Sequence, residues 1–398
     1  MTLDFQKVYN EIQKIGATAK DSERALEERQ DKAIGLFREF ANQPEFLRHL
    51  VEKALEVDPG IRCALPLTQN LDASHDEPAS PEKVTLIAAD GSQIAPNRHD
   101  QILFGLLNVG AIMLQIPQGL SPKTNISSHL LFGNELYEKG NLLSDGIIAL
   151  RRDLLERSKL DELATSFEEP GRPIVTFTDG PVELWGGSES EDAAAFHKSR
   201  DEYKGVLSRL QSRGVITAGY VDKPSANLVI RLLELVGSTS DEWGKLRETA
   251  PLLGVTDRWL FGDKDQPLLN PGQRSTVFAI QSKNSRNYAG TLALHFFYLN
   301  VGSSGHPWPV RVEIPGWVAD DDKKLDILHA TLLEQCRRMG AKPYPYLLHR
   351  AHELAVVTHE DKKQVELMLA NELRRNGSEI GQESYKQSTK DLSKRGSK

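Results

Sequence analysis

The 398-residue sequence contains little cysteine and no long apolar segment. Its two cysteines, Cys63 and Cys336, are too few for a disulfide framework or a cysteine-based zinc site. No apolar run approaches the roughly 20 residues that a membrane span needs, and residues 1–16 show no signal-peptide pattern. We therefore expect a cytoplasmic protein in a reducing compartment, with no membrane association.

The sequence also lacks an excess of basic residues. Its 49 lysines and arginines stand against 56 aspartates and glutamates, which gives a formal net charge of -7. This charge does not exclude a nucleic-acid enzyme, because such an enzyme needs a local positive path and not a positive total. The apolar fraction of 39% is that of an ordinary globular protein, with enough chain for one large core and an accessory element or for two domains.

The chain divides by pattern into four segments. Residues 1–67 carry apolar residues at helical spacing and predict an N-terminal helical arm, for packing on the domain or for contact with a partner. Residues 68–83 are polar and rich in proline and serine, which predicts a linker. We expect residues 84–375 to form the main domain and residues 376–398 to form a polar, mobile tail.

Strand patterns alternate with helix patterns between residues 84 and 235. The clearest strands lie at 84–89, 173–179 and 214–224, the last ending in a polar corner, and the clearest helices lie at 142–167 and 192–212. This alternation predicts the α/β class, with a mixed sheet flanked by helices, and further helices follow towards the C-terminus. In such folds the chemistry collects at strand ends and in the adjacent helices.

Two of these strands end, by pattern, in the same dipeptide. Asp90-Gly91 follows the apolar run "VTLIAA", and Asp179-Gly180 follows "PIVTFT". One interpretation is a simple turn at each place, because Asp-Gly is a favourable turn pair. The other is that neighbouring strands deliver two carboxylates to one sheet edge, where a divalent cation relieves their repulsion. Mg²⁺ and Mn²⁺ both accept carboxylate oxygens as ligands.

Candidates for a third acid lie on the helix before the second strand. Glu156 follows the apolar Leu155, which places it at the border of the expected buried face, and Asp153 is its rival. Surface helices are rich in glutamate, so the residues alone leave open whether either acid belongs to a site.

Four further residues are candidates for binding a phosphate or for assisting its hydrolysis. His352 lies beside the apolar stripe of the C-terminal segment "YPYLLHRAHELAVV", either as a structural histidine or as a metal ligand or proton carrier. Tyr344 precedes that helix, and its hydroxyl is a candidate for contact with a phosphate or a water. Lys223 in "YVDKP" and Arg274 in "PGQRS" are basic candidates, with solvated surface charge as the alternative.

Taken together, these pieces resemble the NurA nuclease family over residues 84–365. They are "AADGSQIAP" after a strand, a glutamate-bearing helix, "FTDGP" on a second strand, "GYVDKP" on a third and "YPYLLHRAHELA". The resemblance implies an RNase H-like core sheet and a site of acids and a histidine around Mn²⁺ or Mg²⁺. It also implies a dimer that processes DNA ends with a HerA-type hexameric ATPase.

Carried over position by position, the resemblance assigns catalytic roles to Asp90, Glu156, Asp179, Tyr344 and His352. The expected metal ligands among them are Asp90, Glu156, Asp179 and His352. Lys223 and Arg274 are the expected substrate-binding residues. Asp153 remains the alternative to Glu156, and the role of Asp222, which precedes Lys223, stays open.

The expected function is a metal-dependent deoxyribonuclease that hydrolyses phosphodiester bonds without sequence preference. We expect exonuclease activity, and endonuclease activity on single-stranded DNA, in DNA repair by end resection. Two other hypotheses remain: a non-catalytic scaffold that recruits an ATPase to DNA, and an RNase H-like enzyme that acts on RNA.

Overall fold

The computed structural model describes residues 3–117, 121–167, 169–185, 193–224, 226–263 and 265–377. The chain forms two compact units. Unit 1 comprises Met1–Ala79 and Tyr220–Arg337, and unit 2 comprises Ser80–Gly219 and Arg338–Lys398. Each unit is therefore discontinuous in sequence, and the four segments expected from the sequence pattern stay predictions.

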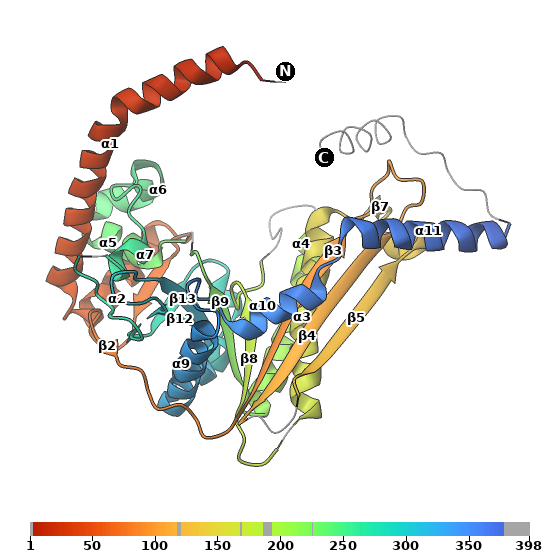
Figure 1. Cartoon of the computed structure of the whole chain (residues 1–398). Coiled ribbons are helices and arrows are strands. Elements are labelled where there is room, and N and C mark those ends of the chain that lie inside the picture. The colour runs from red at the N-terminus through yellow and green to blue at the C-terminus, as the bar shows by residue number, and fades with distance from the viewer. Residues whose placement is uncertain are drawn as a thin grey trace. The chain divides into compact units, whose positions relative to one another are not determined.

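Unit 2 is built on a mixed sheet whose strands lie in the order β9-β8-β3-β4-β5 (Figure 1). The bounds of these strands are β3 Val84–Ile94, β4 Gly105–Ile116, β5 Lys123–Leu131, β8 Ile174–Asp179 and β9 Ile216–Val221, of which the last two residues are assigned to unit 1. Strands β3, β4 and β5 are antiparallel neighbours, and β8 runs parallel to β3. This is the mixed α/β sheet flanked by helices that the sequence predicts, and that prediction is confirmed.

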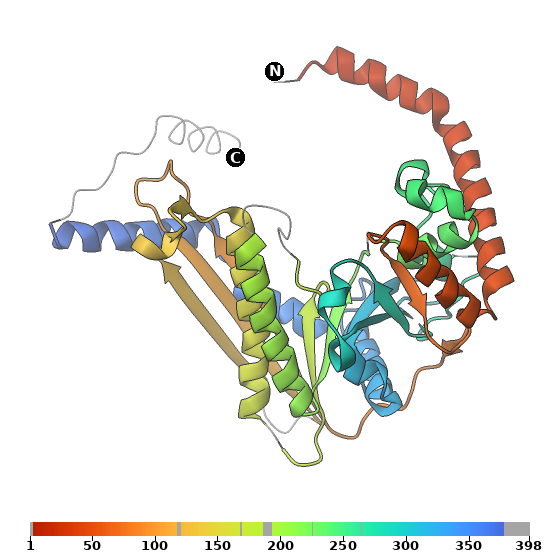
Figure 2. The same ribbon diagram turned by 180° about the vertical axis from the view of Figure 1, so that it is seen from behind.

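Helices cover both faces of this sheet. The bounds are α3 Asp145–Ser166, α4 Ala193–Ser212, α10 Tyr346–Ala355 and α11 His359–Arg375. Helix α3 packs on β3, β4 and α4, and Figure 2 shows α3 and α4 (yellow to yellow-green) side by side over the long strands. Helix α10 also packs on β3 and β4, and Figure 1 shows it over these strands from the opposite side. Because both faces are covered, the run from Val84 to Ala89 is buried without alternation.

Smaller elements complete unit 2. A 3-10 turn at Gly133–Leu136 leads into a hairpin of β6 Tyr137–Glu138 and β7 Asn141–Leu142. The helix α3 then begins at a cap, because the Ser144 hydroxyl accepts a hydrogen bond from the Ile147 backbone N–H at 3.2 Å. An apolar cluster of Ile94, Phe104 and Leu106 packs against residues of α11.

Unit 1 contains an antiparallel sheet in the order β1-β11-β12-β13, with β10 paired to both β12 and β2. Its strands are β1 Cys63–Pro66, β2 Ser74–His75, β10 Arg274–Ser275, β11 Phe278–Gln281, β12 Leu294–Asn300 and β13 Pro309–Pro315. Its helices are α1 Phe5–Phe40, α2 Pro44–Val57, α5 Leu228–Val236, α6 Leu246–Thr249, α7 Asp257–Phe261, α8 Gly316–Ala319 and α9 Asp322–Arg337. Short 3-10 turns lie at Ser240–Lys245, Ser285–Asn287 and Gly290–Leu292.

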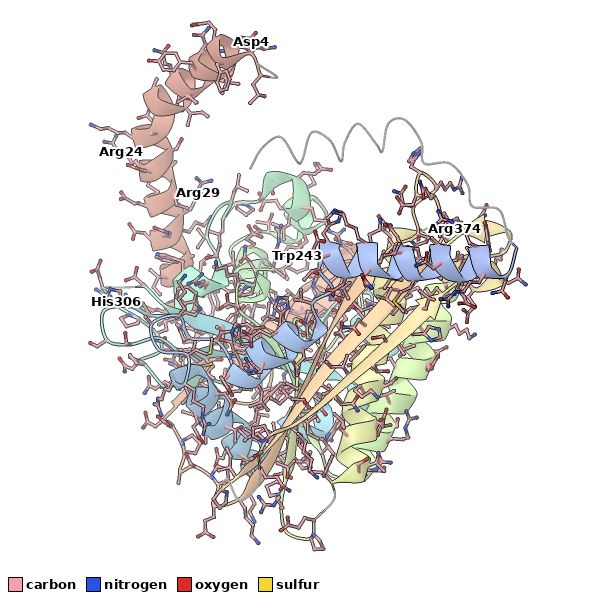
Figure 3. All side chains as sticks on the ribbon, turned by 45° about the vertical axis from the view of Figure 1, so that its right-hand side comes forward. Asp4, Arg24, Arg29, Trp243, His306 and Arg374 are labelled. Carbon is pink, nitrogen blue, oxygen red and sulfur yellow. The ribbon has the colours of Figure 1, made fainter. Side chains whose placement is uncertain are left out.

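The residues predicted as a helical arm form α1, α2 and β1. Only the end of α1 is anchored in unit 1: Ala33 and Phe37 are buried, and the Phe37 ring meets the edge of the Phe261 ring at 6.1 Å. The first part of α1 is exposed, and Figure 3 shows Asp4, Arg24 and Arg29 projecting from it. The segment predicted as a linker contains β2, and residues 378–398 of the predicted tail lie outside the described residues.

One local prediction is wrong. The sequence predicts that Asp90-Gly91 ends its strand, yet β3 continues through both residues to Ile94. The reason is that β4 stays paired with β3 along its whole length, whereas pairing with β8 ends at Ala89 and Thr178. At Asp179 the turn interpretation holds, because β8 ends there and Gly180 has a φ of 88°.

None of the helices in the described residues is long and apolar enough to cross a membrane.

Candidate active site

A pocket of about 430 Å³ opens in unit 2, lined by residues of β3, β8, α3, α10 and the turn after β8. It is lined by four of the residues predicted from the sequence: Asp90, Glu156, Asp179 and His352. The rival third acid, Asp153, lines the same pocket. The sheet explains how Asp90 and Asp179 come to line one pocket. Asp90 is the first residue of β3 beyond the pairing with β8, and Asp179 is the last residue of β8.

Asp90 is joined to His352 by a short hydrogen bond. The distance from His352 Nδ1 to Asp90 Oδ2 is 2.7 Å, and the side chains are 63% and 15% exposed respectively. A carboxylate can only accept, so Nδ1 carries the proton and donates it to Asp90. The Nε2 atom of the neutral ring is then a lone-pair donor, which suits a metal or a proton.

Three residues on β3 and β4 hold the end of α10 against the sheet. The Ser92 hydroxyl donates to the Ala355 carbonyl at 2.5 Å and accepts from the Val357 backbone N–H at 3.1 Å. The Asn108 amide donates to the same carbonyl at 2.8 Å. Gly110 pairs with Asp90, and a Cβ there would lie 2.6 Å from the Ala355 backbone nitrogen. The close approach of α10 to β4 therefore requires glycine.

Glu156 lies on α3 on the other side of β3. Its side chain is 7% exposed, and its carboxylate lies 3.1 Å from Arg152 Nε. Burial raises the pKa of Glu156 to about 8 by disfavouring the charged form, an effect that the nearby Arg157 and Arg152 oppose and the Asp153 and Asp90 carboxylates reinforce.

Gly91 explains why the Glu156 carboxylate reaches the strand. A Cβ at position 91 would lie 2.5 Å from Glu156 Oε1 and 2.7 Å from Arg152 Cγ. Real Cβ atoms do not approach other atoms this closely, so any larger residue at position 91 would displace the Glu156 carboxylate and the Arg152 side chain from the places they occupy here.

The turn that follows Asp179 is held by a buried arginine. Arg157 donates from Nη1 to the Asp153 carbonyl at 3.0 Å and from Nη2 to the Pro181 carbonyl at 3.1 Å. Its guanidinium carbon lies 5.2 Å from the centre of the Tyr203 ring, and the Tyr203 hydroxyl donates to the Val182 carbonyl at 2.8 Å. Helices α3 and α4 thereby fix the backbone next to Asp179.

The remaining predicted residues do not line the pocket. Tyr344 is half-buried in unit 2, two residues before α10 begins. Lys223 and Arg274 belong to unit 1, where Lys223 is exposed and Arg274 is 4% exposed. A substrate contact by Arg274 would require β10 to rearrange. The roles of these three residues stay predictions, and Asp222 accepts a hydrogen bond from Trp308 Nε1 at 2.8 Å.

Five further residues line the pocket that are not among the candidates named from the sequence, namely Arg152, Arg157, Pro181, Glu183 and Trp185. Of these, Arg152 had a readable signal, because it stands four residues before Glu156 on a predicted helix. Glu183 is fully buried and Trp185 is 50% exposed. Nothing in the pattern of "DGPVELW" marks either residue as part of a site.

The donors in the pocket fit a hard divalent cation, because carboxylate oxygens and an imidazole nitrogen are ligands that Mn²⁺ and Mg²⁺ accept. As the side chains lie here, no group of three or more His, Cys, Asp and Glu in the described residues is arranged to hold a metal ion.

The NurA domain model matches residues 84–357, which contain every residue of the pocket. The chain belongs to the NurA family. The resemblance noted from the sequence is thus confirmed, and family membership supports a nuclease. Among curated proteins, none matches this NurA chain significantly.

Solved structures resemble this NurA protein at low sequence identity. The NurA nuclease from Sulfolobus solfataricus has a TM-score of 0.50 at 12% identity, with 93% of this chain and 98% of that chain covered. A NurA structure with manganese has a TM-score of 0.34 at 13% identity, covering 74% of this chain and 91% of that chain. The catalytic domain of human endonuclease V has a TM-score of 0.32 at 12% identity, covering 82% and 98%. At such identities the likeness to the Sulfolobus protein shows the fold alone.

Proposed function

We propose that this NurA protein is a metal-dependent DNA nuclease that hydrolyses phosphodiester bonds. The observation that carries the proposal is the convergence of Asp90, Glu156, Asp179 and His352 on one pocket. These residues come from two strands and two helices that are separated in sequence, and the fold of unit 2 alone brings them together. Three acids and a histidine in one pocket are a set suited to phosphoryl chemistry with a divalent cation.

Asp90, Glu156, Asp179 and His352 are the residues that would hold Mn²⁺ or Mg²⁺. When bound, such an ion polarises a phosphoryl oxygen and makes a nucleophilic hydroxide available near neutral pH. The burial of Glu156 favours this role, because a buried carboxylate is stabilised in its charged form by an adjacent cation.

His352 is placed to orient water or move a proton. Its Nδ1–H donates to Asp90 at 2.7 Å, which fixes the ring orientation and leaves Nε2 as the basic atom. The ring is largely exposed, so a nucleic acid entering the pocket can reach it. Tyr344 and Lys223 remain candidates for holding the phosphate, and Arg274 is a candidate only if its segment opens.

The substrate we propose is DNA, cleaved without sequence preference. We propose exonuclease activity, and endonuclease activity on single strands, in the processing of DNA ends. We also propose a homodimer that works with a HerA-type ATPase, as the resemblance to the family implies. Mixing the protein with the HerA-type ATPase of its own organism on a gel-filtration column tests that partnership, with co-elution expected and separate elution contradicting it.

The activity is tested with end-labelled single-stranded DNA, duplex DNA and RNA in Mn²⁺, with EDTA as the blank. Wild-type protein should release nucleotides from DNA, and Asp179→Asn should lose at least 100-fold of that rate, the size of effect expected for an essential group. Asp145→Asn is the matched control, since Asp145 is an exposed acid in the first turn of α3. DNA cleavage that continues in EDTA or in the Asp179→Asn variant would contradict the proposal. Faster cleavage of RNA than of DNA would show that DNA is not the preferred substrate.

A further inference from the structure

Arg152 places a positive charge among the acids of the pocket. Its Nε lies 3.1 Å from Glu156 Oε1, and its Nη2 lies 2.6 Å from Asp153 Oδ1. The side chain is 30% exposed, so the guanidinium has given up much of its hydration. One arginine thus contacts two of the acids that line the pocket.

The order of the Arg152–Glu156 pair argues against a role in helix stability alone. An i,i+4 pair stabilises a helix better when the acid precedes the base, and here the base comes first. Its neighbour Arg151 gives the contrast, because it points to Glu138 at 3.5 Å and does not line the pocket.

The strand beneath is shaped to receive this arginine. A Cβ at Gly91 would lie 2.7 Å from Arg152 Cγ and 3.0 Å from Arg152 Cδ. The absence of a side chain at position 91 therefore makes room for the Arg152 stem as well as for the Glu156 carboxylate. Strand β3, Glu156 and Arg152 therefore pack closely together at Gly91.

We propose that Arg152 is a built-in counter-ion that competes with the divalent cation for Glu156 and so sets the metal affinity of the site. This inference rests on the proposed function. The guanidinium partly neutralises the acid cluster before a metal arrives, and it repels a divalent ion that approaches the same carboxylate. The consequence is a site of moderated affinity, whose occupancy follows the available Mn²⁺ concentration.

Coulomb's law gives the expected size of the effect. In water-like surroundings, a unit charge close to a divalent ion would weaken the binding of that ion on the order of tenfold. Removing the charge of Arg152 should therefore tighten Mn²⁺ binding roughly tenfold, or about 1.4 kcal/mol.

The test measures Mn²⁺ affinity directly, without DNA or turnover. Isothermal titration calorimetry and the electron paramagnetic resonance signal of free Mn²⁺ are recorded for wild type and Arg152→Gln. Arg152→Met is the second variant, because its stem can still pack against Gly91 if Arg152→Gln fails to fold. Arg151→Gln is the matched control, removing the same charge from the adjacent position of α3.

Roughly tenfold tighter Mn²⁺ binding by the Arg152 variants, with Arg151→Gln unchanged, is the expected result. Unchanged or weaker binding by the Arg152 variants overturns the inference, as does an equal gain in Arg151→Gln. The variant Asp90→Asn distinguishes a failure of the proposed metal site from a failure of the proposed role of Arg152. If it leaves wild-type Mn²⁺ binding intact, the proposed metal site fails; if it abolishes binding while the Arg152 variants bind like wild type, only the role of Arg152 fails.

Discussion

His352 Nδ1 lies 2.7 Å from Asp90 Oδ2, although the two residues are 262 positions apart in the chain. The contact joins a helix near the C-terminus to the strand that begins the sheet of unit 2. It exists because α10 is pinned to β3 and β4 just beyond His352, through the Ala355 carbonyl and the glycine at position 110. The site thus depends on residues that do not line the pocket.

The first prediction concerns the serine that pins α10. Ser92→Ala removes one donor to the Ala355 carbonyl and the acceptor of the Val357 N–H, so α10 should shift and the His352–Asp90 bond should lengthen. Loss of such a supporting contact typically lowers activity on the order of 10- to 100-fold. We expect this loss in kcat, with KM changed less, in steady-state assays on single-stranded DNA.

Ser127→Ala on the exposed face of β5 is the control and should cleave at the wild-type rate. Ser92→Thr keeps the hydroxyl and should recover part of the activity. A Ser92→Ala protein with wild-type kcat would show that α10 needs no such anchor.

The second prediction concerns Gly91. Gly91→Ala places a methyl group 2.5 Å from Glu156 Oε1, so the carboxylate must move out of its position. We expect nuclease activity and Mn²⁺ affinity each to fall at least about tenfold, because both depend on the placement of that acid. Thermal melting should show that the variant still folds.

Gly205→Ala on α4 provides the contrast, since its Cβ meets only Arg209 Nη1 at an ordinary 3.5 Å. It should leave activity unchanged and raise the stability by up to about 1 kcal/mol, as expected for glycine in a helix. Equal activities for the two alanine variants would refute the steric account of Gly91.

The third prediction concerns pH and unit 1. His329 is fully buried on α9 with its Nε2 donating to the Gly272 carbonyl at 2.7 Å, and burial lowers its pKa from 6.5 to about 4. The unfolded chain therefore binds a proton more readily than the folded chain between pH 6.5 and pH 4, so stability falls as the pH falls through this window. The loss from this one group is up to about 3 kcal/mol.

Urea unfolding at pH 7 and pH 4.5 measures this loss in wild type and in His329→Gln. The glutamine does not titrate, so the difference between the two pH values should shrink in the variant. An identical pH dependence in both proteins would show that His329 is not the group responsible.

The sequence was sufficient for the sheet and for the two strand acids. A continuous apolar run marks a strand that is covered on both faces, and the acid that follows the apolar run is then a candidate for a site. Asp90 and Asp179 could be selected on this basis. The role of Gly91 could not be predicted in this way. An Asp-Gly pair looks the same in the sequence whether the strand ends there or continues because another strand, here β4, stays paired with it.

The third acid and its arginine were harder to recognise for a different reason. Asp153 and Glu156 both line the pocket, and only depth separates them, since their side chains are 23% and 7% exposed. Helical spacing predicts which face of the helix a residue lies on, but not how deeply its side chain is buried. The spacing of four residues between Arg152 and Glu156 is visible in the sequence, but only the close packing at Gly91 shows that the arginine lies in the pocket.

Arg274 shows a case in which local composition suggests more exposure than the structure has. The segment "PGQRS" has the composition of an exposed loop, which favoured a basic residue available to a phosphate. In the structure it leads into the short strand β10, paired with β12 and β2, and the guanidinium is buried with Nη1 donating to the Ser275 carbonyl at 3.2 Å. Pairing between distant short strands has no local signal in the sequence.

The most direct test of the central claim is anomalous diffraction at the manganese edge, from crystals of the active protein grown with Mn²⁺. The account predicts an anomalous peak in the pocket, about 2 Å from carboxylate oxygens of Asp90 and Asp179. A protein that degrades DNA in Mn²⁺ but shows no anomalous peak at these residues would contradict it.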